Sequence, residues 1–165
     1  MPPVAVTFGL VPELRQTSHR AIGFLRGESE LNAWQEFTGL AEKTRKYVLT
    51  SMGEWIDGKN GPAQRFRGFP NHQDCWMCFV FKARENRQGH RFYGYLCHPL
   101  PNSNSSFQSC VFCIHAMKNE KETDKSELAG VKAWSSSKAA EEAIRVQYPD
   151  GDNNERKGRQ GQWKN

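Results

Sequence analysis

The stretch Cys75-Trp-Met-Cys-Phe-Val-Phe-Lys82 is a continuous apolar run, and two similar stretches follow it, Arg91-Phe-Tyr-Gly-Tyr-Leu-Cys-His98 and Ser109-Cys-Val-Phe-Cys-Ile-His-Ala-Met117. An apolar run without polar alternation is typical of a strand that is covered on both faces. Residues 87–90, Arg-Gln-Gly-His, predict a turn between the first two runs. Because the connections are short, the three strands are expected to form an antiparallel meander.

Helical patterns flank this meander on both sides. Leu31, Trp34 and Phe37 recur every three residues and predict an amphipathic helix that is capped by Ser29 and stopped at Gly39. Three further helices are expected at residues 42–56, 124–134 and 138–147, the last capped by Ser137, and a short strand is expected at residues 19–25.

Together these elements predict an α+β fold in which a helical hairpin packs on a small antiparallel sheet, with a terminal helix and extended tails. The expected domain spans residues 19–148. Residues 1–18, which contain three prolines, predict an irregular arm or an added strand. Residues 149–165 are polar and basic and predict a mobile tail.

Composition limits the class of protein. The chain has 165 residues, of which 37% are hydrophobic and 12% aromatic, as in a globular domain. Its apolar runs are too short to cross a bilayer, and the first residues show no secretory signal. We therefore expect a cytoplasmic protein without a membrane partner. The five cysteines are an odd number in such a chain, so we expect no disulfide framework.

Positive charge is concentrated in the middle of the chain. The whole protein carries a formal net charge of +5. Residues 59–98 hold the same surplus by themselves, with Lys59, Arg65, Arg67, Lys82, Arg84, Arg87 and Arg91 against Asp74 and Glu85. Clustered cations among aromatic residues are typical of nucleic-acid binding, although a solvated hairpin would have the same composition.

The cysteines form two C-x-x-C pairs, Cys75–Cys78 and Cys110–Cys113, a spacing that is typical of a structural zinc site. The residues between them are Trp-Met and Val-Phe, which favour strands over the tight turns of a zinc knuckle. Residues three apart in a strand face opposite sides of the sheet, so the two thiols of a pair would diverge. We expect no metal and no other cofactor, and the zinc site remains an alternative.

The second strand has one polar and aromatic face. Alternation places Arg91, Tyr93 and Tyr95 on the same side, where bases could stack while a guanidinium binds phosphate. His115 and Lys118 follow at the end of the third strand and are expected at the same surface. Further cations that could reach it are Lys82, Lys121, Arg65 and Arg67.

The order of these parts resembles the RelE/ParE superfamily of toxin–antitoxin toxins, and in particular its HigB-like, phage-derived branch. The similar segments, within residues 22–128, are Trp34-Gln-Glu-Phe37 through Trp55-Ile-Asp-Gly58, Gln88-Gly-His-Arg-Phe-Tyr93, and Cys113-Ile-His-Ala-Met-Lys118 followed by Thr123-Asp-Lys-Ser-Glu-Leu-Ala129. The chain departs from the family where Ala116-Met117 and Asp124 replace Gly-Phe and Pro, and where the first meander strand lacks an arginine.

The resemblance implies metal-independent cleavage of mRNA, commonly in the ribosomal decoding site, and a cognate antitoxin as the partner. It implies that Arg91 and Arg67 stabilise the phosphate, that His115 acts as the acid or base, and that Lys118 supplies charge or a proton. Tyr93, Tyr95, Lys82, Arg65 and Lys121 would then contact RNA. Two alternatives stay open, a ParE-type gyrase poison without catalysis and a zinc-stabilised nucleic-acid-binding module on Cys75, Cys78, Cys110 and Cys113.

Overall fold

The computed structural model describes residues 5–15, 17, 19–59, 66–68, 77–101, 104–119 and 125–148. The strands in this part of the chain are β1 (Thr7–Leu10), β2 (Arg20–Arg26), β3 (Phe66–Gly68), β4 (Cys78–Glu85), β5 (Gln88–Cys97) and β6 (Gln108–Met117). The helices are α1 (Ala33–Gly39), α2 (Glu42–Ile56), α3 (Lys125–Ser135) and α4 (Lys138–Gln147). The chain is thus an α+β protein, as the sequence predicted.

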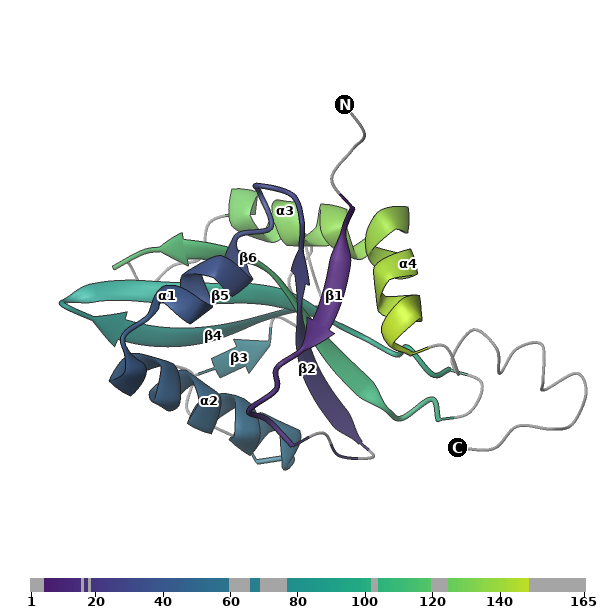
Figure 1. Cartoon of the computed structure of the whole chain (residues 1–165), viewed down its shortest axis with the longest axis horizontal. Helices are drawn as coiled ribbons and strands as arrows, with labels where there is room; N and C mark the ends of the chain where they lie inside the picture. Colours follow the sequence, from purple (N-terminus) through teal and green to yellow (C-terminus); the bar gives the residue numbers. More distant parts are fainter. Residues whose placement is uncertain are drawn as a thin grey trace, which may run out of the picture.

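All six described strands form one sheet in the order β1-β2-β6-β5-β4-β3 (Figure 1). The predicted meander is confirmed, because β4 pairs with β5 and β5 with β6 in antiparallel fashion. The strand β2 adds to the far side of β6 in parallel, and β1 pairs antiparallel with β2. The parallel pair brings the start of the domain beside its last strand, so the helical hairpin between β2 and β3 must cross over one face of the sheet.

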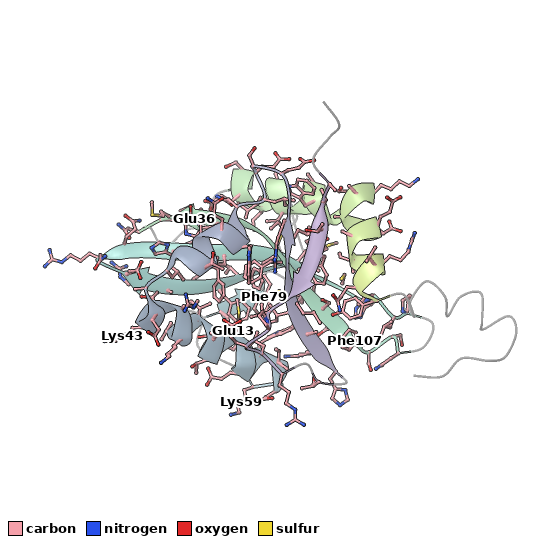
Figure 2. All side chains as sticks on the ribbon, viewed as in Figure 1. Glu13, Glu36, Lys43, Lys59, Phe79 and Phe107 are labelled. Carbon is pink, nitrogen blue, oxygen red and sulfur yellow. The ribbon has the colours of Figure 1, made fainter. Side chains whose placement is uncertain are left out.

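The helices α1 and α2 cover that face. They pack on the sheet through a core rich in aromatic residues, in which Phe37 and Met52 from the helices meet Phe24, Phe81, Phe92 and Phe112 from the strands. Figure 2 shows Phe79 at the centre of the molecule, whereas Lys43 and Lys59 lie near the two ends of α2 and point outward. We call this side of the sheet the α1/α2 face.

The helices α3 and α4 cover the opposite side, the α3/α4 face. Their buried residues Leu128, Val131 and Ile144 pack against Val80, Tyr93, Tyr95 and Val111 of the sheet. Burial on both faces explains why the strand sequences are continuous apolar runs without simple alternation.

Several boundaries differ from the sequence prediction. The hairpin between β4 and β5 turns at Asn86 and Arg87, whose φ angles are 52° and 66°, and not at residues 87–90. Two-residue hairpin loops favour positive φ at both central residues, because the twist of such a turn matches the twist of the flanking strands. The helix α1 is preceded by Asn32 in place of Ser29. Of the two alternatives predicted for residues 1–18, the added strand is present as β1. The predicted tail at residues 149–165 lies outside the described residues.

Candidate functional site

A polar network joins the sheet to helix α3 on the α3/α4 face. Arg91 Nη1 donates to the Tyr93 hydroxyl over 3.3 Å, and this hydroxyl donates to Glu127 Oε1 over 2.8 Å. Lys118 Nζ lies 3.7 Å from the same carboxylate oxygen. We call Arg91, Tyr93, Lys118 and Glu127 the Glu127 cluster. Arg91 is linked to the Glu127 carboxylate through the Tyr93 hydroxyl, and Lys118 pairs with the same carboxylate directly.

Strand register assembles the cluster. Arg91 and Tyr93 are two residues apart on β5 and therefore share a face. Lys82 is paired with Arg91 across β4 and β5, which places a third cation, half-buried, on the same face. Beyond β6, the Lys118 amide donates to the carbonyl of Gly89 over 2.9 Å. A Cβ on Gly89 would overlap the Lys118 carbonyl oxygen, so the glycine permits this close approach.

A β-bulge decides which residues of β6 reach the cluster. Tyr93 pairs with Ile114 and Gly94 pairs with Phe112, which leaves Cys113 without a partner in the ladder. Simple alternation from Val111 would place His115 on the α3/α4 face and Lys118 on the other. The extra residue exchanges the two faces for the residues that follow it. Lys118 therefore lies on the same face as Arg91, and His115 lies on the α1/α2 face. A Cβ on Gly94 would overlap the Val111 carbonyl oxygen, and glycine makes the bulge possible.

The cluster is shielded from solvent. Arg91 is 5% exposed, and the side chains of Lys118 and Glu127 are 7% and 16% exposed. Burial raises the pKa of Tyr93 to about 12, so this phenol stays protonated at neutral pH. A buried cation needs a counter-charge, and the Glu127 carboxylate supplies it in this arrangement.

Histidines form a second polar pair on the α1/α2 face. His90 Nδ1 lies 2.8 Å from His115 Nε2, and each histidine is 8% exposed. Burial and the neighbouring charge of His90 lower the pKa of His115 to about 4, so this imidazole is neutral at pH 7. Asn32 fixes the backbone here: its Oδ1 accepts from the His115 amide over 2.8 Å and its Nδ2 donates to the His115 carbonyl over 3.3 Å.

The structure thus brings together only part of the predicted site. Arg91, Lys118, Lys82 and Tyr93 share the α3/α4 face. His115 lies on the opposite face, so its predicted position beside Lys118 was wrong, and the cause is the bulge. The residues of this predicted site that lie outside the described part are Arg65, Lys121 and the side chain of Arg67.

The predicted stacking surface is covered. Tyr93 is fully buried and Tyr95 is 3% exposed, because α3 packs over the strand that carries them. Alternation correctly predicted that Arg91, Tyr93 and Tyr95 share one face of β5. The prediction that the two tyrosines are exposed for base stacking was wrong.

The cysteines are divided between the two faces. Cys110 lies in the core beneath α1 and α2, and Cys113 lies in the core beneath α3 and α4, as strand geometry predicted. Both are free thiols, and burial raises their pKa values. We expected no disulfide framework, and Cys78 is nevertheless disulfide-bonded, which removes it from a four-thiolate zinc set. Cys75 lies outside the described residues, and among those described no three metal-binding side chains form a group.

Sequence reasoning missed Glu127, His90 and Asn32 as members of these polar groups. Glu127 is in the first turn of α3 and contacts Tyr93 from 34 residues away, so no local signal pairs the two. The same holds for Asn32 and His115, which are 83 residues apart. His90 could have been recognised from alternation, because it shares a strand face with Phe92.

None of the described helices is long and apolar enough to cross a membrane. Comparisons of the chain with protein-family models, with curated proteins and with solved structures gave no match.

Proposed function

We propose that this protein is a toxin of the RelE/ParE type that cleaves mRNA without a metal ion, acts in the cytoplasm on translating ribosomes, and is held inactive by a cognate antitoxin. The observation that carries the proposal is that Lys82, Arg91 and Lys118 lie on one face of the sheet, where Arg91 donates to the Tyr93 hydroxyl and Lys118 lies beside the carboxylate that accepts from this hydroxyl. Several cations at a fixed spacing form a site for a phosphate group.

Cleavage of RNA without a metal ion requires groups that stabilise negative charge and transfer protons, and cationic side chains can do both. The 2′-hydroxyl of the RNA gives its proton to solvent water as its oxygen attacks the adjacent phosphorus, the bond to the 5′-oxygen breaks, and a 2′,3′-cyclic phosphate and a 5′-hydroxyl result. In this proposal Arg91 stabilises the charge on the equatorial phosphate oxygens with its planar donors, and Arg67 adds a second guanidinium. Lys118 donates the proton that the leaving 5′-oxygen takes up.

The acid–base role expected for His115 is not part of this assignment. His115 is neutral at pH 7, one of its ring nitrogens contacts His90, and it lies across the sheet from Arg91. Lys118 now pairs with Glu127, and Arg91 donates to the Tyr93 hydroxyl, which donates to Glu127. An RNA phosphate must therefore take the place of the Glu127 carboxylate, which requires α3 to move away from the strands.

The test is cleavage of a defined mRNA, both free and on translating ribosomes, with the 2′,3′-cyclic ends mapped by sequencing. We expect cleavage that persists in EDTA and falls about 100-fold in Arg91→Lys, which keeps the charge and loses the planar donors. Lys46→Gln is the control, because Lys46 is exposed and pairs with Glu42 across a helical turn. Intact mRNA in both settings, together with unimpaired translation on induction, would refute the proposal.

A second candidate is a ParE-type gyrase poison without chemistry, and the burial of the Glu127 cluster beneath α3 favours it. In that case the buried charges hold α3 in place and a protein surface is the functional element. Arrested replication with intact mRNA after induction would support this candidate over the ribonuclease.

A further inference from the structure

The guanidinium of Arg26 lies on an aromatic ring at the end of β2. Its Cζ atom is 3.8 Å from the centroid of the Trp34 indole, close enough for a cation–π interaction. Gly9 on the neighbouring strand gives the side chain its room, because a Cβ there would lie 2.9 Å from Arg26 Nη2. The plane and position of the guanidinium are therefore fixed by its surroundings.

One hydrogen-bond donor of Arg26 has no partner within the described part of the chain. Its Nε atom is shielded from solvent and has no hydrogen-bond partner there. Burial also lowers the pKa of Arg26 from its ordinary value. A second arginine shows the contrast: Arg20 also lies over an indole, that of Trp55, at 4.6 Å, but its Nη1 donates to the Trp55 carbonyl over 2.6 Å. Of these two arginines, Arg26 is the one with a buried donor that has no partner among the described residues.

Arg26 borders a hollow of about 730 Å³ between the end of β2 and the start of α1. A volume of this size is in the range of ligand-binding sites. Its lining combines a cation, a carboxylate, an indole, an apolar side chain and uncharged polar groups, and it includes Arg26, Glu28, Leu31, Trp34 and Gln35. The hollow is built at the junction of two elements and is separate from the Glu127 cluster.

The charges around the hollow restrict what it can bind. A guanidinium with free donors pairs best with a carboxylate or a phosphate. Glu28 lines the hollow, Glu30 lies in the same loop, and Glu36 follows Gln35 on α1 (Figure 2). These three exposed carboxylates would repel the repeated phosphates of a nucleic acid. A ligand with one carboxylate and neighbouring cations would be complementary both to the Arg26 guanidinium and to the carboxylates around it.

We propose that this hollow is the docking site for a peptide segment of a protein partner, in which one carboxylate side chain stands between apolar and basic residues. The carboxylate pairs with the Arg26 guanidinium, an apolar neighbour packs on Leu31 and Trp34, and the basic residues face Glu28 and Glu36. This site lies apart from the groups assigned to RNA cleavage and does not depend on that activity.

The test is a titration of the full chain with the peptide acetyl-Lys-Leu-Glu-Leu-Lys-amide, followed by the NMR signals of the Trp34 indole N–H and the Arg26 Nε–H. The same peptide with Gln in place of Glu and a uridine hexanucleotide are the comparison ligands. We expect saturable shifts of both signals with the Glu peptide, and affinity at least 10-fold weaker for the Gln peptide and for the variant Arg26→Gln.

Arg20→Gln is the matched control, since it removes the same group from the other arginine–indole pair, and its affinity for the Glu peptide should equal that of the natural chain. The thermal unfolding midpoints of both variants establish that they are folded. Equal binding by Arg26→Gln, no shift with the Glu peptide, or binding of the oligonucleotide in its place would each overturn the proposal.

Discussion

The Nδ1 atom of His90 lies 2.8 Å from the Nε2 atom of His115, on the face of the sheet that α1 and α2 cover. One imidazole donates to the other, so the pair requires at least one of these nitrogens to be unprotonated. Protonation of His115 would also bury a charge beside Phe92, whose ring centroid is 4.9 Å from that of His115. Protonation of this pair at low pH should therefore destabilise the folded protein.

The folded protein should lose stability as the pH falls from about 6.5 to about 4. The pKa of His115 is lowered to about 4 in the folded state, whereas an unfolded histidine titrates near 6.5. Between these values the unfolded chain binds more protons, so the free energy of unfolding falls with pH across this window. We expect a loss of roughly 2 kcal/mol after allowance for solvent screening. Urea unfolding at a series of pH values measures it.

The variant His115→Gln should flatten this pH dependence, because glutamine keeps a hydrogen-bonding group and does not titrate. The control is His19→Gln, since His19 is exposed at a bend before β2. An unchanged pH profile in His115→Gln would show that other groups cause the acid sensitivity.

The substitution Glu127→Gln should destabilise the protein by about 3 kcal/mol. It removes the negative charge that faces the buried Lys118 ammonium, and it replaces the charged acceptor of the Tyr93 hydroxyl with a weaker, neutral amide oxygen. Denaturant unfolding gives the value. Glu141→Gln is the matched control: its partner Arg145 is on the same exposed helix face, and we expect a change below about 0.5 kcal/mol. Equal effects of the two substitutions would contradict the role assigned to the cluster.

Gly89→Ala should cost about 2 kcal/mol or more, since the new Cβ would overlap the carbonyl oxygen of Lys118 and separate β5 from the end of β6. Gly53→Ala is the opposite case. Gly53 lies inside α2 with open space around its Cα, so alanine should stabilise the protein by up to about 1 kcal/mol. Thermal unfolding of the two variants should shift in opposite directions, and a harmless Gly89→Ala would refute this account of the strand pairing.

The thiols of Cys97, Cys110 and Cys113 should resist alkylation in the folded protein. Burial raises the pKa of Cys97 to about 12 and raises those of Cys110 and Cys113 as well, so little thiolate exists at pH 8. Mass spectrometry after iodoacetamide treatment should show these positions unmodified in native buffer and fully modified in urea. Rapid modification without denaturant would mean that the sheet opens at these strands.

Local signals in the sequence predicted much of the fold. The helix at residues 42–56 was predicted at its observed bounds, because turn residues end it and its apolar positions recur on one side. The same holds for α4, where the Ser137 side chain accepts from the amide of Ala140 over 3.2 Å as an N-cap. Alternation placed Arg91 and Tyr93 on one face of β5 correctly, because side chains on a strand change sides at every residue.

Long-range packing determined what the sequence left open. The parallel pairing of β2 with β6 joins segments about 90 residues apart, and no local pattern records it. The unpaired Cys113 reverses the alternation of β6, so Lys118 faces Arg91 and His115 faces His90. Glu127 reaches the sheet only because α3 packs there. Helix ends and strand faces follow from neighbouring residues, whereas the members of a buried polar cluster follow from which elements meet across the sheet.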